Sequence, residues 1–80
     1  MAVPADLEWK PVSSSNLRAI AYQPDFRRLW VSFKNGGVYR YEDVPRALYD
    51  GFLAAPSKGT YLYRIIRANG SDSAFAYARA

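Results

Sequence analysis

The chain has 80 residues, of which half are hydrophobic and 16% aromatic, and its 11 basic and seven acidic residues give a formal net charge of +4. It contains no cysteine and no histidine, which excludes disulfides and thiolate metal sites and removes the commonest acid-base group and metal ligand of neutral pH. We therefore expect no enzyme, no catalytic residues, no metal site and no cofactor.

The length predicts a single domain over residues 1–80, with a core at about 9–67 and a tail at 68–80. A chain this short buries only a modest share of its surface, so it depends on large side chains or on self-association. We expect a homo-oligomer. No apolar run approaches the ~20 residues that span a bilayer, and the N-terminus lacks the charged and apolar regions of a signal peptide. A cytoplasmic protein without membrane contact is the expectation.

The first half of the chain predicts strands. Residues 13–16 form a polar Ser-Ser-Ser-Asn turn, whose side chains can bond neighbouring backbone groups or, alternatively, a ligand. A strand should follow over residues 17–22. Residues 26–33 predict the clearest strand, because Leu29, Val31 and Phe33 alternate with polar residues and Trp30.

The turn at Asn35-Gly36-Gly37 leaves two registers open for the next strand, residues 38–42. A two-residue turn would pair Phe33 with Val38. A three-residue loop with Gly37 at positive φ, making a bulge, would instead set Phe33 against Tyr39 and Val31 against Tyr41. We choose the second register, because it makes both tyrosines at least partly core residues.

Two helices are predicted next. Asp43 is a suitable N-cap, and Pro45 is acceptable in a first turn, so the first helix should run to about Ala54 and turn Leu48, Tyr49, Phe52 and Leu53 toward the sheet. Ser57 can cap a second helix over residues 58–67. Residues 74–78 alternate small and aromatic side chains, so the tail could join this sheet, join a neighbouring subunit or fray.

The predicted fold class is α+β: a three- or four-stranded antiparallel meander covered on one face by two short C-terminal helices. With a single cover, the other sheet face stays open. The residues on that open face would be Arg18, Arg28, Trp30, Ser32 and Arg40.

The strongest local signal for a ligand is Ser57-Lys58-Gly59-Thr60. Free N-H groups at a helix start, hydroxyls and a lysine suit a phosphate or carboxylate, although a serine cap beside a solvated lysine explains the same residues. The pI of 9.6 favours an anionic partner. Acids interleave with the arginines, which indicates a compact anion site and not a long phosphate-binding stripe.

Further candidate contacts lie nearby in the sequence. Arg64 and Arg67 fall one helical turn apart and could hold phosphate bidentately, or could be a solvated helix end. Tyr61 could add an aromatic contact. On the open face, Trp30 beside Arg40 could stack on a base, or could form a dimer contact.

Short motifs follow one another along the chain: Ser14-Ser15-Asn16-Leu17, Leu29-x-Val31-x-Phe33, Tyr39-x-Tyr41, Val44-Pro45 with Tyr49, and Ser57-Lys58-Gly59-x-Tyr61 ending in Ile66-Arg67. From about residue 9 to 67 this order resembles the KTSC domain, a small module found alone and at the C-terminus of some lysyl-tRNA synthetases. The resemblance implies RNA binding as a suggested role. Two positions depart from the family pattern: Tyr63 replaces an expected asparagine, and no aromatic residue closely follows Arg67.

These observations together predict a non-enzymatic protein that binds a phosphate-bearing nucleotide, with a small and possibly cyclic signalling nucleotide favoured over RNA. Limited surface and interleaved charge leave little room for many phosphate contacts. A protein-interaction module that docks through the open sheet face is the alternative of another class.

Overall fold

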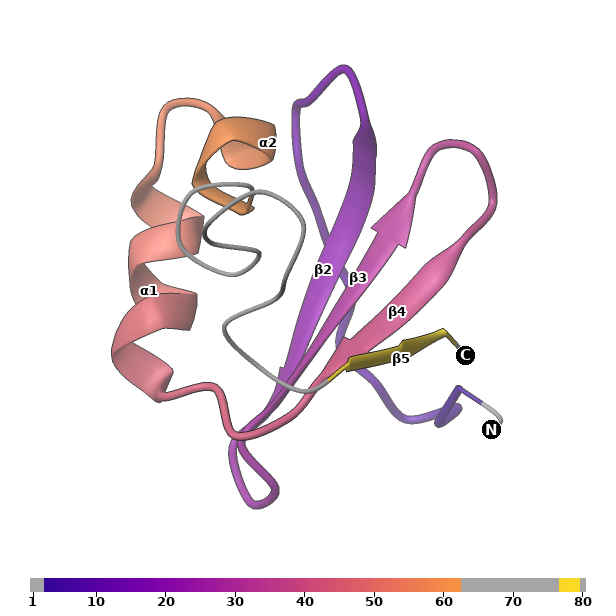
Figure 1. Ribbon diagram of the computed structural model, residues 1–80, viewed down its shortest axis with the longest axis vertical. Helices are drawn as coiled ribbons and strands as arrows, with labels where there is room; N and C mark the ends of the chain where they lie inside the picture. Colours follow the sequence, from indigo (N-terminus) through magenta and orange to yellow (C-terminus); the bar gives the residue numbers. More distant parts are fainter. Residues whose placement is uncertain (1–2, 63–76, 80) are drawn as a thin grey trace.

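The computed structural model describes residues 3–62 and 77–79 as an antiparallel sheet with two helices on one side of it (Figure 1). The strands are β1 (Lys10–Pro11), β2 (Leu17–Gln23), β3 (Arg28–Phe33), β4 (Val38–Tyr41) and β5 (Tyr77–Arg79), and they neighbour one another in chain order. The helices are α1 (Arg46–Ala54) and α2 (Lys58–Tyr61). No helix within these ranges has the length and apolar character to span a bilayer.

The predicted α+β class and antiparallel meander are confirmed, with two corrections. The sheet has five strands, because Lys10–Pro11 pairs with β2 and the tail segment Tyr77–Arg79 pairs with β4. The helices are not C-terminal, since both lie mid-chain before β5. The part of the predicted second helix beyond Leu62 lies outside the described residues.

The core lies between the helices and one face of the sheet. Ile20, Leu29 and Val31 from the central strands meet Tyr49 and Phe52 of α1 in one buried cluster, as the helical spacing of the two aromatics predicts. Leu53 is 38% exposed, so the prediction that it faces the sheet is wrong. It follows Phe52 by one residue, which turns its side chain about a quarter of the way around the helix.

In the β3–β4 hairpin the two tyrosines of β4 share a sheet face with Leu29 and Val31, as predicted, but the pairing register differs. Val31 pairs with Tyr39 and Leu29 with Tyr41, two residues away from the expected partners, and positive φ falls on Gly36 (98°), not Gly37. The Gly36 N-H donates to the Phe33 carbonyl at 3.0 Å, which closes the loop after Lys34 and Asn35. A two-residue shift preserves side-chain alternation, so Tyr41 is still buried.

The start of α1 is not capped by Asp43 as predicted. Pro45 occupies the N-cap position without a side-chain cap hydrogen bond, while Asp43 has a left-handed backbone with φ 60°. Arg27 is also left-handed, with φ 53°, and its carbonyl accepts from the Val44 N-H at 2.8 Å. Aspartate tolerates this conformation better than most residues, and here it turns the chain from β4 into α1.

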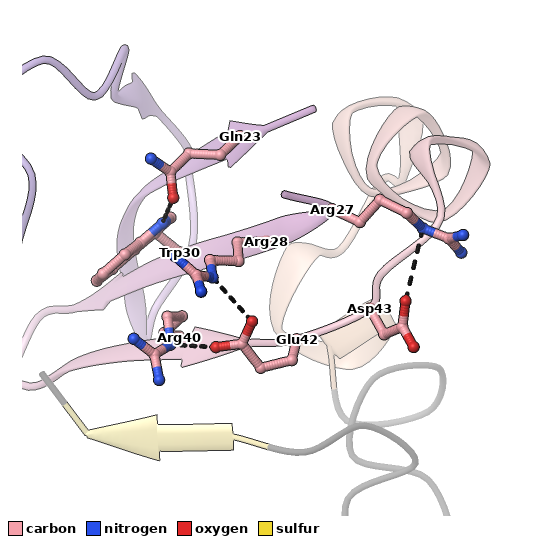
Figure 2. A network of polar contacts seen from close by, with 7 residues as sticks. All are labelled: Gln23, Arg27, Arg28, Trp30, Arg40, Glu42 and Asp43. Carbon is pink, nitrogen blue, oxygen red and sulfur yellow. Dashed lines mark hydrogen bonds and ion pairs between the residues drawn. The ribbon is translucent and has the colours of Figure 1, made fainter. Parts of the chain in front are cut away.

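The sheet face away from the helices is not open around Trp30, which corrects the prediction of an open face there. Trp30 is only 1% exposed, and its indole Nε1 donates to the Gln23 side-chain oxygen at 2.8 Å (Figure 2). Figure 1 shows the N-terminal segment passing behind the sheet on this side. Trp30 is therefore a structural residue of the sheet.

Candidate ligand pocket

A cavity of about 480 Å³ opens where α2 faces the β1–β2 loop. Both segments lie at the same end of the molecule, together with the tip of the β3–β4 hairpin (Figure 1). We call this cavity the serine pocket; its lining consists of residues 13–17, Phe33, residues 56–60 and Leu62. Its volume is within the range of small-molecule sites.

One wall of the pocket is the serine turn after β1. The Ser14 hydroxyl oxygen accepts hydrogen bonds from the backbone N-H groups of Asn16 and Leu17, each at 3.2 Å. Next to it, the Asn16 carbonyl accepts from the Lys34 N-H at 2.8 Å. The turn network predicted for residues 13–16 is therefore present, and it fixes this wall against β2 and the hairpin.

The facing wall is the start of α2, where Ser57 caps the helix as predicted. The Ser57 hydroxyl accepts from the Thr60 N-H at 3.4 Å and bonds the Thr60 hydroxyl at 3.0 Å. Lys58 is half-buried, and its amine donates to the carbonyl of Ala55. An ammonium group has three donors, so this bond anchors the charge at the cavity and leaves it able to contact a ligand.

Gly59 brings the two walls close together. A Cβ at this position would lie 3.7 Å from the Ser14 hydroxyl and 3.9 Å from the Asn16 amide nitrogen. These are ordinary contact distances, so Gly59 is not required by packing. Its missing side chain instead leaves backbone accessible between the walls.

The electrostatics of the serine pocket favour an anion. Lys58 contributes its charge, and no carboxylate is among the described residues that line the cavity. Hydroxyl and amide groups supply the remaining polar surface, while Leu17, Phe33 and Leu62 supply an apolar part. This mixture suits a ligand with a charged end and a flat or apolar end.

A tyrosine anchors α2 to α1 behind the pocket. The Tyr61 hydroxyl donates to the Leu48 carbonyl at 2.9 Å, and its ring stacks on Phe52 with centroids 5.3 Å apart. Gly51 makes room for this ring, because a Cβ there would come within 2.5 Å of the Tyr61 hydroxyl. Burial raises the pKa of the Tyr61 hydroxyl. Tyr61 thus positions the pocket wall and is not among the residues lining the cavity.

Apart from Tyr61, the predicted site residues divide into three groups. Four of them, Ser57, Lys58, Gly59 and Thr60, line the serine pocket. Arg64 and Arg67 lie outside the described residues, so their predicted phosphate contacts stay predictions.

Trp30 and Arg40 form the third group and lie together on the far sheet face. The Arg40 guanidinium is 6.0 Å from the centre of the Trp30 ring, so the two are neighbours as predicted. Arg40 also forms an ion pair with Glu42, which pairs with Arg28 through a 2.8 Å contact (Figure 2). Trp30 is enclosed, so this structure offers its ring to neither a base nor a dimer partner.

Sequence reasoning did not place Phe33 at the site. The alternation of β3 assigned Phe33 to the core face of the sheet. Phe33 is the last residue of that strand, and the strand end reaches the pocket. Residues 13–16 form the predicted turn network and also line the pocket, so a structural role and the predicted ligand contact do not exclude each other.

Comparisons with known proteins agree with the fold. The KTSC domain profile matches residues 13–69. A KTSC domain protein from Yersinia pestis, known from a crystal structure, is 34% identical and superposes with a TM-score of 0.81 over 92% of this chain and 97% of its own.

Sequence relatives include both small proteins and part of a large enzyme. An uncharacterized protein from Stutzerimonas stutzeri is 36% identical over 56 residues, covering 70% of this chain and 79% of the relative. A lysine–tRNA ligase from a Nostoc species is 34% identical over 53 residues, covering 66% of this chain but 9% of the ligase.

Proposed function

We propose that this chain, which belongs to the KTSC domain family, is a non-enzymatic protein that binds a small phosphate-bearing nucleotide in the serine pocket. One observation carries the proposal. Two polar motifs about 40 residues apart in the sequence, residues 13–16 and residues 57–60, line one cavity that contains a lysine and has no carboxylate among its described lining residues.

The binding chemistry follows from these groups. The Lys58 ammonium neutralises phosphate charge, while the Thr60 hydroxyl, which accepts from Ser57, and the backbone near Gly59 donate hydrogen bonds to the phosphate. Charge-assisted hydrogen bonds are roughly twice as strong as neutral ones. A single anchored lysine with several neutral donors suits one phosphate group better than a polymer of phosphates.

Thermal shift and calorimetry against mono-, di- and cyclic nucleotides test the proposal. We expect saturable binding at fixed stoichiometry that weakens about 10-fold or more in Lys58→Ala, since a charge-assisted bond contributes about 1.5–3 kcal/mol. Arg46→Ala is the matched control, because Arg46 is a solvent-exposed cation on α1 that is not among the described lining residues. Equal loss in both variants, or no loss in Lys58→Ala, contradicts the site.

RNA remains the second candidate, because one relative is a segment of a lysine–tRNA ligase. RNA binding should tighten with oligonucleotide length and weaken steeply between about 50 and 200 mM salt. A small nucleotide should show a shallow salt dependence. The salt slope therefore separates the two candidates.

Two wider predictions concern self-association and location. We propose self-association, because the small core leaves Phe26 59% and Leu53 38% exposed; light scattering of the purified protein at several concentrations tests it, and a monomer at every concentration contradicts it. The cytoplasmic location also stays a prediction. The alternative of docking through an open sheet face depended on an exposed Trp30, and Trp30 is buried.

A further inference from the structure

A second hollow adjoins the serine pocket on its hairpin side. It has a volume of about 470 Å³ and is lined by Ser15, Asn16, Phe33, Lys34 and Asn35. We call it the hairpin pocket. The two pockets share Ser15, Asn16 and Phe33 in their linings, so they adjoin. We call the two lobes together the groove, and Phe33 borders both of them.

Phe33 is held firmly at this junction. Its strand position pairs with Leu17, its N-H donates to the Gly37 carbonyl at 2.8 Å, and its ring meets Tyr39 edge-on with centroids 5.5 Å apart. The Lys34 N-H bonds the Asn16 carbonyl at 2.8 Å, which ties the hairpin to the serine turn. Phe33 is only partly buried, so an ordered aromatic surface remains accessible in the groove.

The lobes differ in chemistry. The α2 side of the groove carries Ser57, Lys58 and Thr60, which suit a phosphate. The hairpin side carries Phe33 with the amides of Asn16 and Asn35, and also the solvent-exposed Lys34. Asn35 uses its side-chain oxygen to accept from the Gly37 N-H at 3.0 Å, which orients its NH₂ group as a donor. An aromatic surface flanked by amides suits the face and edge of a base.

From this arrangement we infer that Phe33 is the base-stacking residue of the groove and that the ligand is a nucleoside phosphate, with its base in the hairpin pocket and its phosphate in the serine pocket. The inference rests on the proposed function and adds to it the stacking residue and the orientation of the ligand. A sugar phosphate or inorganic phosphate would occupy only the serine pocket. Base stacking on a protein aromatic contributes enough to distinguish them by at least about 5-fold in affinity.

Calorimetry with adenosine and guanosine monophosphates against ribose 5-phosphate tests the inference. We expect wild type to bind a nucleotide at least about 5-fold more tightly than ribose 5-phosphate. Phe33→Leu should weaken nucleotide binding by at least about 5-fold more than it changes ribose 5-phosphate binding, and Phe33→Tyr should retain the wild-type preference. Circular dichroism and thermal unfolding check that Phe33→Leu is folded.

A second measurement uses only the wild type, in case Phe33→Leu unfolds. Ring protons of Phe33 should shift upfield when the nucleotide is added and should be unaffected by ribose 5-phosphate. Equal affinity for nucleotide and sugar phosphate, or an unaltered preference in folded Phe33→Leu, overturns the inference and leaves the phosphate site intact. If no phosphate compound binds to the wild type, the proposed function itself fails.

Discussion

The serine pocket and the sheet face around Trp30 both contain residues that a sequence marks as ligand contacts, yet the structure uses them differently. Around Trp30, Gln23 satisfies the indole, and Glu42 lies between Arg28 and Arg40 as a shared counter-ion (Figure 2). In the serine pocket, hydroxyls and a lysine border a cavity with no carboxylate among its described lining residues. The charges of the first region are paired with one another, whereas the polar groups of the second line a cavity.

A cluster of arginines and aromatics therefore does not identify a binding surface by itself. What distinguishes the two regions is that carboxylates neutralise the arginines near Trp30, whereas the polar groups of the serine pocket border a cavity whose described lining holds a lysine and no carboxylate. The comparison also makes opposite predictions: changes around Trp30 should alter stability, whereas changes in the serine pocket should alter binding.

The largest expected effect is that of Trp30→Ala, which should lower the free energy of unfolding by about 3–5 kcal/mol, as urea denaturation measures. For a small domain this is most of the total stability. Trp30→Phe keeps an aromatic ring and loses the bond to Gln23, so it should cost only about 1–2 kcal/mol. A folded Trp30→Ala protein of near wild-type stability that no longer binds nucleotide contradicts the comparison.

A smaller effect is expected at Gly51, where an added methyl group collides with Tyr61. Gly51→Ala should gain about 1 kcal/mol of helix propensity but lose more by displacing Tyr61 from Leu48 and Phe52, for a net destabilisation of about 1–2 kcal/mol. Thermal unfolding measures it.

Gly59→Ala is the matched control for Gly51→Ala, because the added Cβ meets only Ser14 and Asn16 at ordinary distances. We expect equal or higher stability together with weaker nucleotide binding, since the methyl group enters the serine pocket. If both alanines destabilise the fold equally, the packing argument for Tyr61 is wrong.

Alkaline pH provides a test of the tyrosines that support the core. Burial raises the pKa of Tyr22, Tyr49 and Tyr61 above the ordinary value of 10.0, so the fold favours the neutral phenol. Their contribution is complete below about pH 10 and is lost as pH rises through the higher folded-state pKa values. Unfolding measured from pH 8 upward should show stability falling by up to about 1.4 kcal/mol per pH unit for each tyrosine. Tyr61→Phe should reduce that slope, and an unchanged slope would show that Tyr61 does not titrate with unfolding.

The smallest effects concern the carboxylates beside the Trp30 face. Glu42→Gln removes the shared counter-ion of two partly buried arginines and should cost about 1 kcal/mol. Asp43→Asn affects only an exposed 3.8 Å contact with Arg27, and asparagine accepts the same left-handed backbone, so the change should stay within about 0.5 kcal/mol. Urea denaturation of the two variants side by side distinguishes them, and equal costs would contradict the role given to Glu42.

The sequence was sufficient for the parts of the fold that depend on local patterns. The strand β3 with Leu29 and Val31 in the core, the spacing of Tyr49 and Phe52, and the serine cap of α2 were all confirmed. It was insufficient where the outcome depends on distant segments. The burial of Trp30 depends on the segments that pack against that face of the sheet. The two-residue shift of the hairpin register depends on which glycine adopts positive φ. Neither follows from the strand pattern.

Half of the candidate site, residues 57–60, could be predicted from the sequence. Ser57 through Thr60 carry a local capping signal, whereas their meeting with residues 13–16 depends on α2 returning to the β1–β2 loop. The alternating pattern of β3 could not assign Phe33 to the groove. Such a pattern indicates which face of the sheet a residue occupies, but not whether other segments cover the end of the strand.

The most direct test of the central claim is an amide NMR titration of the ¹⁵N-labelled protein with the best-binding nucleotide at low and moderate salt. We expect saturable shifts at residues 13–17, Phe33 and residues 56–60, with the amides near Trp30 unchanged. Shifts centred on Trp30, Arg28 and Arg40, or none at saturating nucleotide, would contradict it.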